Sequence, residues 1–281
     1  MKKIFIYIIA SMLFLGTACE EVIDWEVKEG QVRLVVEGSV TNELKNHTVT
    51  LSRTINYFDN PSNMRVSNAN VSLTDGERIF MYEEVENSGT YQSTMPFSAE
   101  VGKTYTLAIT LQQEIGGYSS FEASTTMHRL VPFDSITVDY EKEPGFDEML
   151  YVVNVYGTEP ANTIDHYKAL VYRNSNLLTE QVDEVLYFND ELVQGQTFDS
   201  FALYSTDEIM EGDEITLEVY AIEKGYFDFL NNMSSAKEGG DPFGMSGPLS
   251  NVFGNISNNA LGYFYAADKA KLKALAREDH Q

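Results

Sequence analysis

The only cysteine of this chain, Cys19, stands where a sulfur atom could be acylated. It directly follows Gly16–Ala18, small residues that fit the narrow pocket of a signal peptidase. The apolar run Ile4–Leu15 follows two lysines and is shorter than the roughly 20 residues that a membrane-spanning helix requires. These features predict a signal peptide over residues 1–18 that is cleaved before Cys19. They resemble a bacterial lipobox, with Gly16 where that motif usually has an aliphatic residue.

We therefore expect Cys19 to carry lipid and to hold the mature chain on a membrane. Each buried methylene contributes about 0.8 kcal/mol, so two or three acyl chains make such attachment effectively permanent. An ordinary signal peptide with a cysteine near its end is the alternative. Residues 19–30 are acidic and predict a tether that resembles the surface-export signal of Bacteroidetes lipoproteins. The alternative for this segment is a solvated linker in an acidic protein.

Paired carboxylates are the next candidates for chemistry, because a glycosidase needs two of them about 5–9 Å apart in a cleft. Adjacent acidic residues occur at Glu83/Glu84, Asp183/Glu184, Asp190/Glu191, Asp207/Glu208 and Asp213/Glu214. We interpret these pairs as solvated surface, since a chain with 43 Asp and Glu residues produces many by chance. No D-x-[DN]-x-[DN]-G calcium loop is present. Calcium held between loops is left as an alternative, and no metal site or cofactor is predicted.

Nucleophilic catalysis has weaker support. The sequence has no G-x-S-x-G motif, and its cysteine is assigned to lipid. His47, His128, His166 and His280 occur in unrelated contexts. His166 is the best candidate for a general base, with a hydrogen-bonded histidine at a strand edge as the favoured interpretation. We predict that the protein is not an enzyme.

The charge balance excludes one class of partner. The chain has 19 Lys and Arg residues against 43 Asp and Glu residues, a formal net charge of −24. Such a polyanion repels phosphate backbones, so nucleic-acid binding is excluded. One cysteine also excludes an intramolecular disulfide.

Exposed aromatic rings are a possible ligand surface, because sugars stack on them. The chain contains 17 Tyr and 16 Phe residues. Tyr57 and Phe58, beside the turn residues Asp59 and Asn60, are the residues that we propose for such a surface. The alternative is that they pack between sheets, as most aromatic residues do.

The elements that must position these residues read as mainly β, because apolar and polar residues alternate with period two. The strands predicted before residue 130 are Val32–Val40, His47–Thr54, Ala69–Thr74, Arg78–Glu83, Gly89–Met95, Thr104–Gln112 and Ser119–Met127. Turn residues such as Asp75-Gly76 separate them. This spacing predicts an antiparallel, Ig-like β-sandwich over residues 31–130. The stretch Ala69–Gly76, followed by Ser88–Tyr91, resembles transthyretin-like sandwiches.

A second β-rich domain is predicted over residues 131–281, after a boundary at Leu130–Pro132. Its predicted strands are Asp134–Tyr140, Met149–Gly157, His166–Asn174, Leu177–Gln181, Leu186–Phe188, Ser200–Ser205 and Glu214–Ile222. Gly225–Ser235 has apolar residues at three- and four-residue spacing, which predicts a short helix. Ala266–Arg277 combines strong helix formers with strand-like alternation, so both structures stay open for it. The fold predicted overall is two antiparallel sandwiches with a helix in the second.

A series of short motifs, taken in order, resembles one family of Bacteroidetes envelope lipoproteins, the DUF4249 family. They include Cys19–Asp24, Leu34–Gly38, Val101–Leu107, Tyr226–Leu230 and Gly239–Phe243. The resemblance implies a lipid-anchored outer-membrane protein, often linked with TonB-dependent transporters, and it implies no catalytic residues. Lys269–Arg277 departs from it, being more basic and helix-prone than the final strand that the family leads us to expect.

The function that we expect is therefore a non-enzymatic outer-membrane lipoprotein that assists a TonB-dependent receptor in capturing a ligand. The first alternative is a structural surface protein or adhesin like the fimbrillins, which donate a terminal strand to a neighbour. The second is a secreted hydrolase that uses an acidic pair.

Overall fold

The structure is a computed structural model. Its described part contains fifteen β-strands and one α-helix. The structure describes residues 30–55, 64–131, 133–142, 148–161, 163–180, 184–238 and 252–278. Cys19, the signal peptide, nearly all of the predicted tether, and Tyr57 and Phe58 lie outside these residues, so those expectations stay predictions. Within the described ranges, no helix is both long enough and apolar enough to cross a lipid bilayer.

The strands of the first half follow the predicted alternation of buried and exposed residues. They are β1 (Leu34–Thr41), β2 (Thr48–Arg53), β3 (Asn70–Thr74), β4 (Ile79–Glu84), β5 (Thr90–Ser93), β6 (Thr104–Ile115) and β7 (Tyr118–Thr126). In β6, for example, Tyr105, Leu107 and Ile109 are buried and the residues between them are not. The strands pair in the order β1-β2-β5-β4-β3-β6-β7, and their buried side chains form one hydrophobic core.

The strands of the second half surround another core. They are β8 (Phe133–Lys142), β9 (Met149–Thr158), β10 (His166–Arg173), β11 (Asn176–Leu177), β12 (Leu186–Asn189), β13 (Thr197–Thr206) and β14 (Glu214–Ile222). β9 pairs with β8 and β13, whereas β10 pairs with β11, β12 and β14. Val153 and Val155 of the first group share a core with Tyr167, Leu217 and Val219 of the second.

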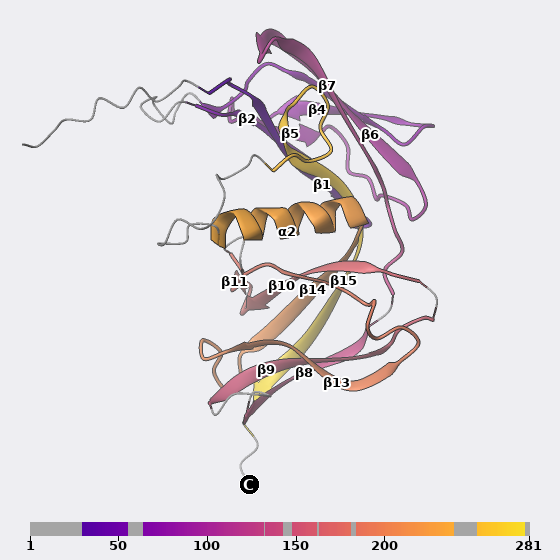
Figure 1. The fold of residues 1–281 in the computed structure, drawn as a ribbon, viewed down its shortest axis with the longest axis vertical. Coiled ribbons are helices and arrows are strands. Elements are labelled where there is room, and N and C mark those ends of the chain that lie inside the picture. The colour runs from indigo at the N-terminus through magenta and orange to yellow at the C-terminus, as the bar shows by residue number, and fades with distance from the viewer. Residues whose placement is uncertain are drawn as a thin grey trace, which may run out of the picture. The chain divides into compact units, whose positions relative to one another are not determined.

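The long strand β15 (Leu261–Arg277) joins the two halves. Residues 261–267 pair in parallel with β1, residues 268–275 pair antiparallel with β14, and residues 276–277 pair in parallel with β8. Figure 1 shows this strand in yellow, running between the β1 and β14 regions. All fifteen described strands are therefore connected in one large sheet.

The β-rich fold is confirmed, but the sheet is mixed and not wholly antiparallel as predicted. The parallel pairs arise because β15 lies beside β1 and β8, and long stretches of chain form the crossover connections from these two strands to β15. The first core likewise includes Phe264 and Ala266 of β15. The division into sandwich domains over residues 31–130 and 131–281 stays a prediction.

The segment Ala266–Arg277, left open between helix and strand, is part of strand β15. Leu272 and Ala274 pack against the second core, whereas Lys271 lies 2.9 Å from the carboxylate of Glu218 on β14. The alternation of apolar and basic residues therefore favours a strand more strongly than the helix propensity of these residues favours a helix.

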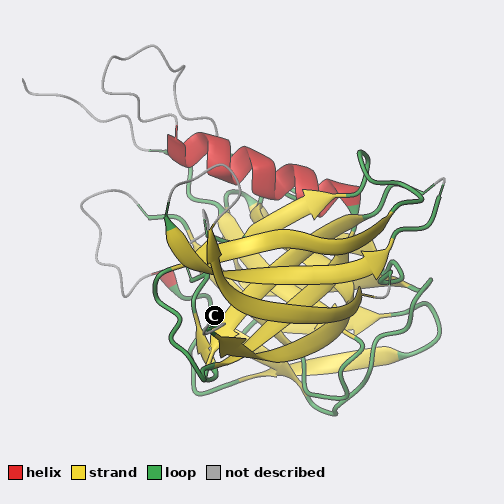
Figure 2. Ribbon diagram, turned by 90° about the horizontal axis from the view of Figure 1, so that it is seen from below, coloured by secondary structure: helices red, strands yellow, loops and turns green. Residues whose placement is uncertain are grey.

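Helix α2 (Lys224–Glu238) confirms the helix predicted at Gly225–Ser235. Figure 2 shows it lying along one face of the strands. Tyr226 and Leu230 pack there with Tyr220 and Tyr263 in a third apolar cluster. The helix covers the face of β14 that is turned away from the second core.

Candidate functional site

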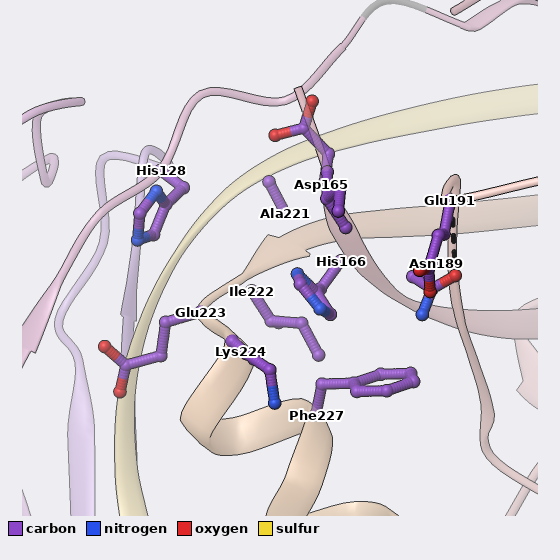
Figure 3. A pocket seen from close by; sticks show the side chains of 11 residues that line it. His128, Asp165, His166, Asn189, Glu191, Ala221, Ile222, Glu223, Lys224 and Phe227 are labelled. Carbon is purple, nitrogen blue, oxygen red and sulfur yellow. Dashed lines mark hydrogen bonds between the residues drawn. The ribbon is translucent and has the colours of Figure 1, made fainter. Parts of the chain in front are cut away.

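A cleft of about 560 Å³ opens where β10 and α2 begin. Figure 3 shows its lining, which comes from four parts of the chain: His128 after β7, Asp165 and His166 at the start of β10, Glu191 after β12, and Phe227 in α2. Sites for small molecules commonly have volumes of 300–1,000 Å³ and combine apolar walls with a few polar groups. The cleft has the size and composition of such a site.

Of the two histidines that line the cleft, His166 is the more buried. Its ring centroid lies 4.9 Å from that of Phe227, and the two planes are tilted by 59°. Burial, and then the positive charge of Lys224, lowers the pKa of His166 below its ordinary value of 6.5. The imidazole is therefore neutral at pH 7, when it offers one hydrogen-bond donor and one acceptor.

Charged groups at the start of α2 are held by partners outside the cleft. Lys224 Nζ lies 2.6 Å from a carboxylate oxygen of Asp228, one helical turn further on. Glu223 accepts a hydrogen bond of 2.9 Å from the hydroxyl group of Tyr263. The cleft thus displays both signs of charge beside an aromatic ring, which suits a small polar ligand.

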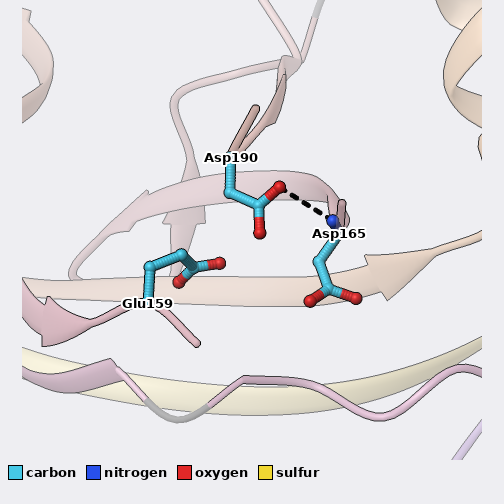
Figure 4. Close-up of side chains that lie close together, drawn as sticks. All are labelled: Glu159, Asp165 and Asp190. Atoms are coloured by element: carbon cyan, nitrogen blue, oxygen red, sulfur yellow. Dashed lines mark hydrogen bonds between the residues drawn. The ribbon is translucent and has the colours of Figure 1, made fainter. Parts of the chain in front are cut away.

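Three carboxylates meet at one side of this cleft, and we refer to Glu159, Asp165 and Asp190 as the acid cluster. One carboxylate oxygen from each residue lies within 4.8 Å of the other two. Glu159 is 3% exposed and Asp190 is 2% exposed, whereas Asp165 is half-buried and also lines the cleft. Figure 4 shows that the three side chains converge, Glu159 and Asp165 from the two ends of the connection between β9 and β10, and Asp190 from the residue after β12.

Hydrogen bonds hold the backbone of Asp165 and Asp190, and one carboxylate oxygen each of Asp190 and Glu159. The backbone N–H of Asp165 donates to Oδ1 of Asp190 at 2.8 Å, and the N–H of Asp190 donates to the carbonyl oxygen of Asp165 at 3.3 Å. The hydroxyl group of Tyr167 donates to Oε1 of Glu159 at 2.7 Å. The loops after β9 and β12 are thereby tied to the start of β10.

Crowding of like charges governs the protonation of the acid cluster. Burial, together with the neighbouring Asp190 carboxylate, raises the pKa of Glu159 from 4.5 to about 7. Burial and the Glu159 carboxylate likewise raise the pKa of the Tyr167 hydroxyl group. Three carboxylates this close are not all ionised without compensation, so the cluster holds either a proton or a cation.

The structure corrects one interpretation of the acidic pairs. Asp190 of the pair Asp190/Glu191 is buried and not solvated surface as predicted, because its carboxylate accepts a hydrogen bond from the N–H of Asp165 and its own N–H donates to the carbonyl oxygen of Asp165. Glu191 is exposed, as are Asp207 and Glu208.

The histidines are also less scattered than their sequence contexts indicate. His128 and His166 line the same cleft although 38 positions of sequence numbering separate them. His47 is a core residue, 1% exposed, with Nε2 lying 3.0 Å from the carbonyl oxygen of Phe97. His280 lies outside the described residues.

Sequence reasoning missed Glu159 and Asp165 as members of a site. They occur in no recognisable motif at the two ends of the connection between β9 and β10, and the pairing of β10 with β12 brings Asp190 to them. The one signal available was Asp165 beside His166, which was considered only as part of a possible general base.

Comparison with known proteins gives the family. The model of a family described as a domain of unknown function, DUF4249, matches residues 20–273. No protein of curated function matches the chain. Since the match covers most of the sequence, including the cleft and the acid cluster, the chain belongs to the DUF4249 family.

Proposed function

We propose that this protein is a lipid-anchored outer-membrane protein of a Bacteroidetes cell, which captures a ligand for a TonB-dependent transporter without catalysing a reaction. Membership of the DUF4249 family and the position of Cys19 after Gly16–Ala18 support the anchor. The resemblance of the short sequence motifs to this family supports the link with a transporter.

The cleft is the observation that carries the binding role. It is large enough for a small solute, and it offers a neutral imidazole, an aromatic ring and charged groups that are already held in place. Two of the three acid-cluster carboxylates are at most 3% exposed, so a substrate could not reach them as a hydrolytic pair. Binding of a small polar ligand is the role that this arrangement supports best.

The anchor is tested by mass spectrometry of the N-terminal peptide of protein purified from native membranes. We expect cleavage before Cys19 and acyl chains attached to that residue. The Cys19→Ala variant is the control and should lose both the modification and the membrane attachment. An unmodified Cys19 in membrane-derived wild-type protein would contradict the proposal.

The partner is tested by purifying the tagged, full-length protein from native membranes in several mild detergents. We expect a β-barrel receptor in the wild-type sample and none with Cys19→Ala. A monodisperse lipoprotein without a barrel in every detergent rejects the transporter role. Heat-sensitive ladders on gels would indicate strand-donating assembly, as in an adhesin.

The cleft is tested by releasing small molecules from the same preparation with acid and identifying them by mass spectrometry. We expect a compound in the wild-type sample that is reduced at least about tenfold with His166→Leu, since a lost polar contact in a binding site weakens affinity by this order. Glu208→Gln, an exposed change elsewhere, should leave the compound bound.

We also propose that the two large cores belong to two sandwich domains that share β15. The separation of the buried residues into two clusters supports this division. A protease site inserted at residue 132 tests it, because the cleaved pieces should stay associated through β15. Immediate separation into two stable pieces would show that β15 does not hold them.

A further inference from the structure

We propose that the acid cluster, formed by Glu159, Asp165 and Asp190, binds one calcium ion. This site is independent of the proposed ligand and transporter, and it concerns a part of the fold for which sequence analysis predicted no metal.

The geometry of the three carboxylates matches a calcium coordination sphere. Calcium lies about 2.3–2.6 Å from its oxygen ligands, so two ligands on opposite sides of the ion are roughly 5 Å apart. One oxygen each from Glu159, Asp165 and Asp190 lies within 4.8 Å of the others. The three oxygens are therefore close enough to one another to share a single ion.

A second observation points to a ligand in this space. Asp190 is 2% exposed, and its Oδ2 atom has no hydrogen-bond partner in the described part of the chain. Oδ2 of Asp165 is buried and unpartnered as well. Figure 4 shows the free oxygen of Asp190 directed toward the space between Glu159 and Asp165, away from the hydrogen bond made by its other oxygen.

The charges around the cluster leave its carboxylates uncompensated. Among the ion pairs between described residues, none involves Glu159, Asp165 or Asp190. A buried, unpaired carboxylate is strongly unfavourable, and a divalent cation removes this cost. The remaining bonds from Tyr167 and from the backbone of Asp165 hold the carboxylates in place, so the site is organised before the ion arrives.

The donor set favours calcium over other divalent ions. All three ligands are carboxylate oxygens, which suit hard cations, and none is sulfur or imidazole nitrogen. Asp165 also lines the cleft, so water can complete the six to eight ligands that calcium takes. Magnesium demands near-ideal octahedral geometry and binds few all-protein sites of this kind.

A proton shared between Glu159 and Asp190 is the alternative occupant, and calcium content distinguishes the two. The full-length lipoprotein in detergent is treated with EDTA, exchanged into metal-free buffer and then mixed with CaCl₂ or MgCl₂ at equal ionic strength. Bound metal is counted by elemental analysis after gel filtration, and thermal unfolding is followed by circular dichroism.

We expect one equivalent of calcium per chain and a rise in the unfolding midpoint of roughly 5 °C when calcium exceeds its dissociation constant about 100-fold. Asp190→Asn and Glu159→Gln keep the shape of the side chain and remove one charge. Each should abolish the bound equivalent and the calcium-dependent rise, while being at least as stable as wild type in EDTA. Asp207→Asn, at an exposed acidic position, should behave as wild type.

Wild-type protein that retains no calcium and melts at the same temperature in calcium as in EDTA would overturn the proposal in favour of the shared proton. Equal stabilisation by magnesium, or calcium binding that survives both Asp190→Asn and Glu159→Gln, would also overturn it, since either result indicates general attraction to an acidic surface.

Discussion

The carboxylate of Glu218 on β14 and the ammonium group of Lys269 on β15 lie 2.9 Å apart, with side chains only 8% and 6% exposed. Lys271 lies 2.9 Å from the other oxygen of the same carboxylate. The hydroxyl group of Tyr220 donates a third contact to Glu218, at 2.5 Å. This network fixes the register of the two strands, because a shift of one residue would bury a lysine without its partner.

Loss of the Glu218 carboxylate should therefore be costly. Glu218→Gln leaves the buried Lys269 with Glu43, 3.2 Å away, as its remaining carboxylate partner among the described residues, and we expect the free energy of unfolding to fall by about 2 kcal/mol. The matched control is Glu214→Gln on the same strand, whose partner Lys273 lies 2.7 Å away with both side chains about half exposed. This change should cost less than about 1 kcal/mol. Urea unfolding measures both, and similar losses for the two variants would refute the role of burial.

Glu43, which follows β1, should make stability depend on acid pH. Burial acts to raise its pKa, but hydrogen bonds from Lys45 and Lys269 outweigh this effect and lower the pKa from 4.5 to about 2. The unfolded chain then binds more protons than the folded one over this interval. The stability that Glu43 contributes is thus present above pH 4.5 and is lost as the pH falls toward about 2.

The measurement is the difference in unfolding free energy between wild type and Glu43→Gln at several pH values. It should be largest near neutral pH and shrink steadily below pH 4.5. A difference that stays constant down to pH 3 would show that the lysines do not stabilise the ionised carboxylate.

His47 should oppose folding at mildly acidic pH. Burial lowers its pKa below 6.5, so the unfolded chain takes up a proton that the folded chain does not accept. Stability should fall as the pH drops below 6.5, until the folded pKa is reached. His47→Gln should lose packing at all pH values but should lack this part of the pH-dependent loss. His128→Gln, at an exposed position, tests whether any histidine has the same effect.

Gly262 should not tolerate a side chain where β15 passes β1. Its φ angle is +88°, and an added Cβ would lie 2.0 Å from the carbonyl oxygen of Val36. Gly212 has a similar φ of +84° but open space around it, so it isolates the backbone strain from the collision. We expect Gly262→Ala to cost at least about 3 kcal/mol, or to prevent folding, and Gly212→Ala about 1–2 kcal/mol. Equal unfolding midpoints for the two variants would contradict the close approach of the two strands.

Local structure was largely predictable, because it depends on neighbours in sequence. The alternation that marks β6 or β14, and the spacing that marks α2, are properties of short segments. Lys269–Arg277 shows the limit of helix propensity. Its residues favour a helix in isolation, but in the strand paired with β14 its apolar side chains face a core and its lysine side chains lie near carboxylates.

Long-range relationships were not predictable from a single sequence. The parallel pairing of Val36 with Gly262 joins residues that no local pattern connects. The acid cluster has the same origin, since Glu159, Asp165 and Asp190 come together only after β12 pairs with β10. Charge alone predicted that Asp190 lies in water, because sequence does not reveal which of many acidic residues the loops enclose.

The position of β15 has a consequence for how the chain folds. Asn42, just after β1, donates a hydrogen bond to Asp268 across 226 positions of sequence. Contacts between residues so far apart in sequence form slowly. The long loop between them must close, and lose conformational entropy, before the contacts can offset that loss. Both halves of the sheet need β15 to complete their strand pairing, and every other described strand precedes β15 along the chain. A growing polypeptide consequently lacks the backbone hydrogen bonds that β1, β14 and β8 make with β15 until residues 261–277 have been added.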